Sequence, residues 1–252
     1  MFCGRLFSVL LAAMALPAAI AEPLTLAVAS NFARPAHELA ARFEVETGRS
    51  VRVTTGSTGK LFAQISNGAP FDVLLAADSE RPRRLEDSGD GVRGSRFTYA
   101  TGSLVLWSRD PDLGSGGCLQ ALEQLGDRKL AIANPLTAPY GAAARQFLES
   151  VDLWEPVQPN LVFGENIAQT LQFVASGNAS LGLIANVQAV DQRLPEAVCR
   201  WQVPASSHAP IEQQAILLAR AAQNDVARAF LDFIEGPAAI EIIRSHGYQV
   251  QE

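Results

Sequence analysis

Leu24–Phe32 reads LTLAVASNF, six mostly apolar residues followed by Ser-Asn-Phe. The apolar run predicts a short buried strand, and Ala33–Glu46 after it spaces its apolar side chains as a helix does. A second unit of this kind follows, because a predicted strand at Val51–Thr55 leads through Gly56-Ser57-Thr58-Gly59 into a predicted helix at Lys60–Ser66. Repetition of strand, polar turn and helix indicates a parallel α/β sheet.

The rest of the chain continues this alternation. Further strands are predicted at Val73–Ala77, Tyr99–Trp107, Leu130–Ala133, Leu161–Phe163, Leu181–Ala185, Ala197–Val203 and Gln214–Leu218. Further helices are predicted at Ser79–Ser88, Cys118–Leu125, Tyr140–Ser150, Ala168–Ser176, Val226–Glu235 and Ala238–Ser245. The sequence therefore predicts an α/β fold with mostly parallel sheets that helices cover on both faces.

Two lobes are expected, because the chain has enough length for two α/β units but no flexible linker between them. Extended segments that cross from one lobe to the other are predicted at Tyr99–Leu106 and Val203–Gln214. We therefore expect a discontinuous first lobe, formed by residues 22–101 and 207–252, and a second lobe formed by residues 102–206.

The first 21 residues differ from the rest. Arg5 is followed by an almost wholly apolar run from Leu6 to Ile20, and Ala19-Ile20-Ala21 is a small-x-small cleavage site. These features predict a cleaved secretory signal peptide over residues 1–21 and an exported protein. An uncleaved anchor is the alternative, which the short apolar run disfavours.

Export also bears on the cysteines. Without Cys3, which lies in the predicted signal peptide, the exported chain keeps Cys118 and Cys199, an even pair in an oxidising compartment. We expect them to form a disulfide, with two buried free thiols as the alternative.

The charge balance is acidic. The chain has 20 Lys and Arg against 26 Asp and Glu, a net charge of −6, and loss of Arg5 leaves 19 − 26 = −7. This balance disfavours nucleic-acid binding, which favours basic stripes, and no polybasic run is present for a membrane surface. We expect a monomer.

Four turns join a predicted strand to a predicted helix start. They are Ala29-Ser30-Asn31-Phe32, Gly56-Ser57-Thr58-Gly59, Ala138-Pro139-Tyr140-Gly141 and Gly164-Glu165-Asn166-Ile167. Helix starts offer unpaired N–H groups and the positive end of the helix dipole, and turns of this kind lie at the ligand-binding edge of a parallel sheet. A single such turn is explained by helix capping, but four of them favour an anion site.

Enzyme chemistry finds little support. The Gly56–Lys60 segment fails as a phosphate-binding loop, because Thr54 stands where a glycine is needed and Leu61 where Ser or Thr is needed. The three histidines are far apart, and no cluster has the spacing of metal ligands. We expect no cofactor and no bound metal cation.

The motifs resemble those of the periplasmic molybdate-binding proteins of ABC transporters, which have the two-lobed type II periplasmic binding protein fold with its ligand cleft between the lobes. The resemblance covers nearly all of the exported chain. It rests on Val28–Phe32, Gly56–Leu61, Gly68–Val73, Ala133–Pro135, Ala138–Gly141, Gly164–Ile167, Phe173–Ala179 and Phe233–Pro237.

The resemblance implies an oxyanion ligand, molybdate or tungstate, a location in the periplasm, and a membrane permease as partner. It implies that hydroxyl and N–H groups of the first lobe bind the ion at Ser30, Asn31, Ser57 and Thr58, and that Tyr140 and Ile167 bind it from the second lobe. One departure stands out, because many members carry a tyrosine where this chain has Ala185. The phenol of Tyr140 is the candidate substitute.

A protonated phosphate needs an acceptor such as aspartate, and the four turns contain no aspartate; the only basic residue beside them is Lys60. This favours molybdate, tungstate or sulfate. The alternatives are a binder of sulfate or another small anion, or less favourably an enzyme on the same two-lobed scaffold.

Overall fold

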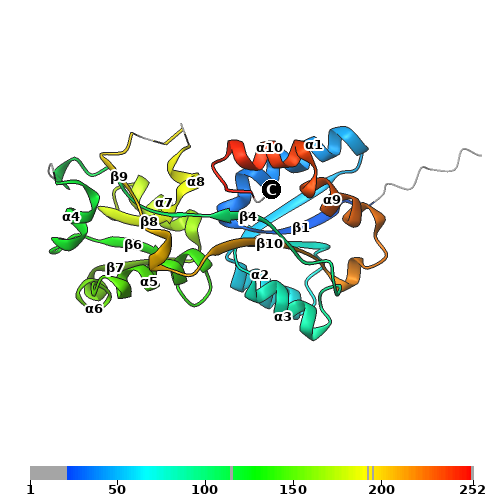
Figure 1. The fold of residues 1–252 in the computed structure, drawn as a ribbon, viewed down its shortest axis with the longest axis horizontal. Coiled ribbons are helices and arrows are strands. Elements are labelled where there is room, and N and C mark those ends of the chain that lie inside the picture. The colour runs from blue at the N-terminus through cyan, green and yellow to red at the C-terminus, as the bar shows by residue number, and fades with distance from the viewer. Residues whose placement is uncertain (1–21, 114–115, 192, 195, 251–252) are drawn as a thin grey trace, which may run out of the picture.

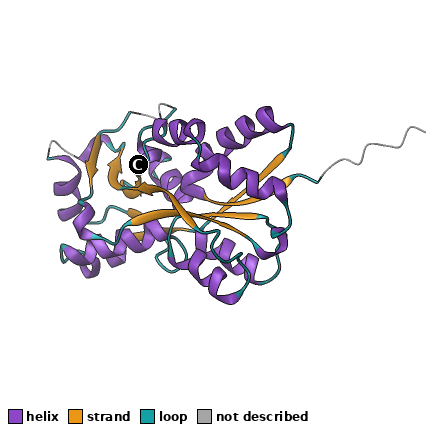
Figure 2. Cartoon of the chain, turned by 45° about the vertical axis from the view of Figure 1, so that its right-hand side comes forward, coloured by secondary structure: helices purple, strands orange, loops and turns teal. Residues whose placement is uncertain are grey.

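The computed structural model of the protein describes residues 22–250, apart from residues 114–115, 192 and 195. The predicted signal peptide lies outside these residues. Two lobes lie side by side along the long axis, each built on a five-stranded sheet (Figure 1). Helices cover the outside of both lobes and the strands lie inside (Figure 2).

The sheet of the first lobe is covered on both faces. Its strands lie in the order β2 (Val51–Gly56), β1 (Leu24–Ala29), β3 (Val73–Ala76), β10 (Ile211–Leu217) and β4 (Phe97–Gly102). One face packs against α1 (Ala33–Thr47), α9 (Asp225–Glu235) and α10 (Pro237–Ser245), and the other against α2 (Thr58–Ser66) and α3 (Glu80–Ser88). The apolar residues predicted for Leu24–Ala29 therefore lie in the centre of this lobe.

The second lobe repeats the plan. Its strands lie in the order β7 (Leu161–Gly164), β6 (Leu130–Ala133), β8 (Leu181–Ala185), β5 (Leu104–Ser108) and β9 (Cys199–Gln202). Its helices are α4 (Gly117–Glu123), α5 (Pro139–Ser150), α6 (Trp154–Val157), α7 (Ile167–Ala175) and α8 (Asn186–Ala189). Helices α4, α5 and α6 contribute to one apolar cluster, and α7 packs against the other face of the sheet.

Both sheets are mostly parallel, as predicted, and each contains one strand that runs the other way. That strand is β10 in the first lobe and β5 in the second. Because β1 and β6 occupy the same place in the two sheet orders, as do β2 and β7, the four predicted turns follow equivalent strands at the carboxyl ends.

The extended run predicted as one strand at Tyr99–Trp107 is two strands. It pairs with β10 as β4 up to Gly102, and from Leu104 it pairs with β8 as β5. The chain passes from one sheet to the other at Ser103, and a single strand cannot hydrogen-bond to both sheets. It returns between β9 and β10, so the chain crosses twice between the sheets.

Several boundaries also differ from prediction. Helix α2 begins two residues before Lys60, and β10 begins at Ile211 instead of Gln214. The four-residue helices α6 and α8 were not predicted, because one turn is too short to show a period. The structure also has single 3-10 turns at Ser30–Phe32, Pro111–Leu113, Gln158–Asn160, Ala205–Ser207 and Ala219–Ala221.

A disulfide joins α4 to β9. Cys118 and Cys199 have their Cα atoms 5.5 Å apart, within the usual range for a disulfide, and enclose a sequence separation of 81 residues. The bond fixes a helix to the edge strand of the second sheet. No helix within the described part of the chain is long and apolar enough to cross a membrane.

Candidate functional site

The first turn begins with the 3-10 helix Ser30–Phe32, which follows β1 directly. Asn31 is buried, and its amide Nδ2 donates to Gln213 Oε1 at 2.7 Å and to Tyr248 Oη at 2.8 Å. The Tyr248 hydroxyl donates to the Asn31 carbonyl at 3.1 Å. The Asn31 side chain therefore holds the turn in place, and since both Nδ2 hydrogens are used, the backbone N–H is the donor of this residue that is left for a ligand.

The second turn presents a free hydroxyl. Ser57 is the N-cap residue of α2 but its side chain does not cap the helix, and its buried Oγ has no hydrogen-bond partner among the described residues. The hydroxyl of the next residue has a partner within the fold, because Thr58 Oγ1 accepts the N–H of Ala77 at 3.1 Å. The two predicted hydroxyls thus differ, and only that of Ser57 is without a partner.

The third turn presents Tyr140 at the start of α5. Pro139 has no N–H, and the amides of Gly141 and Ala142 both donate to the carbonyl of Ala138, which leaves the Tyr140 N–H at the helix start for a ligand. The Tyr140 hydroxyl is buried near the phenol of Tyr248, but no described residue completes a hydrogen bond of normal geometry with it. Burial raises the pKa of this phenol, so it stays protonated and able to donate.

The fourth turn presents Ile167, the first residue of α7. The cap residue Asn166 accepts the N–H groups of Ala168 at 3.0 Å and Gln169 at 3.1 Å through its side chain. The cap does not use the N–H of Ile167. Gln188 holds this residue from behind, because its Nε2 donates to the Ile167 carbonyl at 3.1 Å while its Oε1 accepts the N–H of Ala185 at 3.1 Å.

All six predicted residues line one cavity between the lobes. The lining consists of Ala29, Ser30, Asn31, Gly56, Ser57, Thr58, Ala138, Pro139, Tyr140 and Ile167, and none of these ten described residues is charged. About 10 Å³ is open to the centre of a water molecule, which is roughly the room that one water molecule needs. The site suits a compact solute bound by neutral donors.

The lobes are in contact around this cavity. The N–H of Gly59 in the first lobe donates to the carbonyl of Thr137 in the second at 2.8 Å. Two ion pairs also join the lobes, Lys60 Nζ to Glu165 Oε1 at 2.6 Å and Arg34 Nη1 to Asp191 Oδ1 at 2.8 Å. The structure therefore represents a closed form.

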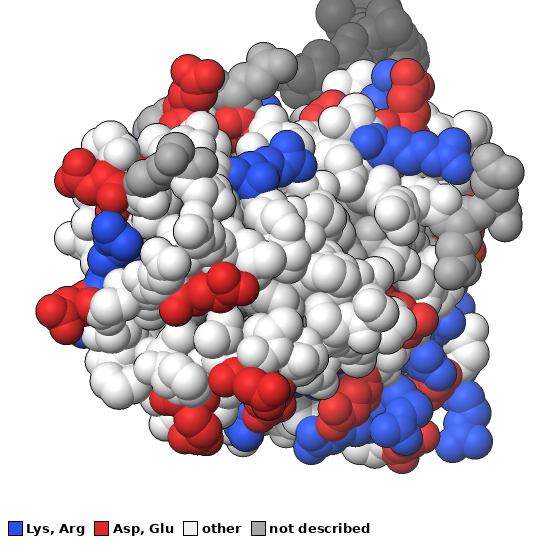
Figure 3. Space-filling view, turned by 60° about the vertical axis from the view of Figure 1, so that its left-hand side comes forward, with Lys and Arg blue, Asp and Glu red and all other residues white. Residues whose placement is uncertain are grey.

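Charged groups lie outside the cavity. Glu165, which neighbours a predicted helix start, pairs with Lys60 and does not line the cavity. On the face shown in Figure 3, acidic and basic side chains are interspersed around a broad uncharged area. No cluster of three or more metal-ligating side chains occurs in the part of the chain that the structure describes.

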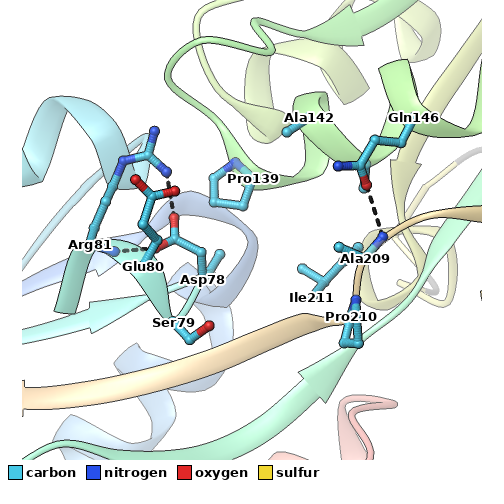
Figure 4. A pocket seen from close by; sticks show the side chains of 12 residues that line it. Asp78, Ser79, Glu80, Arg81, Pro139, Ala142, Gln146, Ala209, Pro210 and Ile211 are labelled. Carbon is cyan, nitrogen blue, oxygen red and sulfur yellow. Dashed lines mark hydrogen bonds and ion pairs between the residues drawn. The ribbon is translucent and has the colours of Figure 1, made fainter. Parts of the chain in front are cut away.

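A second, larger cleft opens between the lobes. It lies between the start of α3, helix α5 and the segment that crosses back to β10, and about 220 Å³ is open to the centre of a water molecule (Figure 4). Two pairs of its lining residues bond to each other: Arg81 bonds Asp78 at 2.5 Å, and Gln146 accepts the N–H of Ala209 at 2.8 Å. This cleft contains none of the six predicted site residues.

Sequence reasoning missed the residues that hold the site. Gln213 and Tyr248 fix Asn31 from 182 and 217 residues away along the chain, and Gln188 fixes Ile167. Local sequence carries no sign of such distant partners. The one available signal was a polar Gln213 within a predicted crossing segment, where a buried side chain has to find a partner.

The chain is similar to known solute-binding proteins. The family described as bacterial extracellular solute-binding protein matches residues 24–249. The molybdate-binding protein ModA of Azotobacter vinelandii is 44% identical over 98% of both chains, and that of Rhodobacter capsulatus is 43% identical over 93% of this chain and 91% of the relative.

Solved structures of solute-binding proteins also superpose on this chain. The periplasmic molybdate-binding protein of Azotobacter vinelandii superposes with a TM-score of 0.85 at 37% identity, over 91% of this chain and all of that one. The sulfate-binding protein SubI of Mycobacterium tuberculosis shares the fold, with a TM-score of 0.75 at 13% identity, over 91% of this chain and 87% of that one. The chain belongs to the family of bacterial extracellular solute-binding proteins.

Proposed function

We propose that this protein captures molybdate, and also tungstate, in the periplasm and delivers it to the membrane permease of an ABC transporter. The names of its relatives and the cavity between its lobes support this function. The proposed role is binding, not catalysis. The apolar segment and cleavage site of the first 21 residues support export, which the mass of the exported protein tests.

The observation that carries the proposal is the pair of buried, unpartnered hydroxyls of Ser57 and Tyr140. They belong to different lobes and line the same cavity. A buried donor without a partner costs about 1–3 kcal/mol, so two in one small cavity indicate a ligand that accepts hydrogen bonds. A fully deprotonated oxyanion offers only acceptors.

The proposed ligand set follows from the turns. We propose that Ser30 and Ser57 bind the ion through their hydroxyls, and that Asn31 and Thr58 bind it through their N–H groups. From the second lobe, Tyr140 contributes and Ile167 donates its N–H. Since neither lobe surrounds the cavity alone, we propose that the ion enters an open form and that the lobes, residues 22–101 with 207–252 and residues 102–206, close about the crossing segments.

The residues that line the cavity also predict which anions the site rejects. A protonated phosphate needs an acceptor for its own O–H, and no carboxylate is among the ten described residues of the lining. Calorimetry with molybdate, tungstate, sulfate, phosphate and chromate tests the proposal. We expect molybdate and tungstate to bind far more tightly than phosphate. Equal affinity for phosphate contradicts the assignment, and tighter binding of sulfate makes the protein a sulfate carrier.

A further inference from the structure

All three tyrosines of the sequence gather where the chain crosses between the lobes. Tyr99 and Tyr248 belong to the first lobe, and their rings lie 4.8 Å and 5.3 Å from the ring of Phe32. Tyr140 reaches this group from α5 in the second lobe. Burial raises the pKa of the Tyr99 and Tyr248 phenols, and the nearby phenol of Tyr140 raises both further, so all three are neutral.

Gly102, the last residue of β4, faces the phenol of Tyr140. A Cβ atom at position 102 would overlap the Tyr140 hydroxyl and would lie 3.1 Å from its Cζ and 3.3 Å from Gln213 Nε2. The backbone of Gly102 is not in the left-handed region, so an alanine could adopt its conformation. A side chain at position 102 is therefore excluded by lack of space and not by backbone conformation, because the hydroxyl of Tyr140 occupies the space that a Cβ atom would need.

The space lies close to the end of β8. Ser103 follows Gly102, and its carbonyl accepts the N–H of Asn186 at 2.8 Å. Asn186 directly follows Ala185, the last residue of β8. The phenol thus reaches from α5 to the segment that hydrogen-bonds just beyond the end of β8. The phenol of Tyr248 lies near its hydroxyl, but no described residue completes a hydrogen bond of normal geometry with it, and Tyr140 also lines the cavity.

We propose that Gly102 is a positioning residue for the ligand site, which leaves the space that lets Tyr140 place its hydroxyl at the cavity. This inference rests on the proposed function, because it takes the hydroxyl as a donor to the bound oxyanion. Gly102 does not touch the ion; it acts through Tyr140. A side chain at position 102 must move the phenol, and the ion then loses a donor without any change in the lining residues.

A double-mutant cycle tests this proposal. Gly102→Ala and Tyr140→Phe are measured singly and together for molybdate affinity by calorimetry and for the thermal midpoint of the ligand-free protein. We expect each single variant to weaken molybdate binding roughly 5- to 30-fold, the loss of one hydrogen bond to a charged group. In the Tyr140→Phe background, Gly102→Ala should weaken binding less than about threefold, because the overlapping atom is gone.

The control is Ser103→Ala, which changes the same crossing segment without adding an atom beside the phenol. It should bind molybdate as the parent does. Additive losses in the cycle, or parental affinity of Gly102→Ala, overturn the proposal. If the parent binds neither molybdate nor tungstate, the proposed function fails and the proposal with it. The thermal midpoints then still show whether position 102 and the hydroxyl compete for space.

Discussion

At the scale of single residues, the neighbouring hydroxyls of Ser57 and Thr58 have different roles. The hydroxyl of Ser57 has no partner in the described structure, whereas that of Thr58 accepts the N–H of Ala77. One hydroxyl is left for a ligand and the other is part of the fold. Adjacent substitutions should therefore separate binding from stability.

We expect Ser57→Ala to weaken molybdate binding by about 1–3 kcal/mol, roughly 5- to 150-fold, because the ion loses a donor. Its thermal midpoint without ligand should stay near that of the parent, since no hydrogen bond of the free protein is removed. Thr58→Val should have the opposite effect. It should lower the free energy of unfolding by about 1–3 kcal/mol, because the buried N–H of Ala77 loses its acceptor, and leave the molybdate affinity unchanged. Calorimetry and thermal unfolding measure both. If the two variants behave alike, the division of roles is wrong.

At the scale of elements, the sequence indicates more about the turns than about what holds them. Short apolar runs followed by small polar residues identify β1, β2, β6 and β7 and the turns after them, because strand and helix starts have local signals. The partners of Asn31 come from β10 and from the C-terminal segment, where no local pattern marks them. The break at Ser103 was missed for a related reason, since only pairing with two different sheets divides that apolar run.

The disulfide belongs to the same scale, because it ties α4 to β9. Closing a loop of this length limits the unfolded chain and stabilises the fold by about 4 kcal/mol in the chain-entropy model. We expect the double variant Cys118→Ala/Cys199→Ala to unfold at a lower denaturant concentration, by a free energy of this order. Its molybdate affinity should be close to that of the parent, since neither residue lines the cavity. A large loss of affinity at unchanged stability would show that the bond shapes the site.

At the scale of the whole molecule, closure depends on a close approach of backbone to backbone. A Cβ atom at Gly59 would lie 2.8 Å from the carbonyl oxygen of Thr137 and 3.0 Å from its Cα, and neither atom can move aside as a side chain end would. We expect Gly59→Ala to hold the lobes apart and weaken molybdate binding by about 1–3 kcal/mol, as overpacking does. The thermal midpoint of the free protein should change little, because open lobes avoid the contact.

Thr137→Ala is the comparison for this variant, because it keeps the carbonyl that Gly59 binds. It should retain affinity, and scattering should show the same compaction on ligand addition as in the parent. If Gly59→Ala also retains affinity and compaction, closure does not depend on this contact.

The charged contacts of Asp191 predict a pH dependence. Hydrogen bonds from the Arg193 side chain and backbone, with the charge of Arg34, lower the pKa of Asp191 to about 2 against the opposing effect of burial. A carboxyl whose pKa is lowered by folding contributes its full stabilisation when the pH is above its pKa in the unfolded chain, which is about 4. This contribution is lost as the pH falls towards 2. We expect Asp191→Asn to lower the free energy of unfolding by up to about 2 kcal/mol at pH 7.

The difference between parent and Asp191→Asn should shrink between pH 4 and pH 2. Glu165→Gln is the comparison, because Lys60 and Glu165 have side chains 49% and 54% exposed and such pairs contribute about 0–1 kcal/mol. If the difference in free energy of unfolding between the parent and Asp191→Asn stays constant down to pH 2, this would falsify the pairing of Asp191 with its arginines.

An ion held by uncharged groups keeps its whole charge. None of the ten described residues that line the cavity is ionised, so capture of a dianion adds its full charge to a chain whose sequence already carries −6. No proton has to be gained or lost on binding, and the heat of binding should not vary with the ionisation enthalpy of the buffer. The loaded protein should migrate faster towards the anode in native electrophoresis. A membrane partner would then meet two forms of the carrier that differ in electrostatic potential as well as in shape.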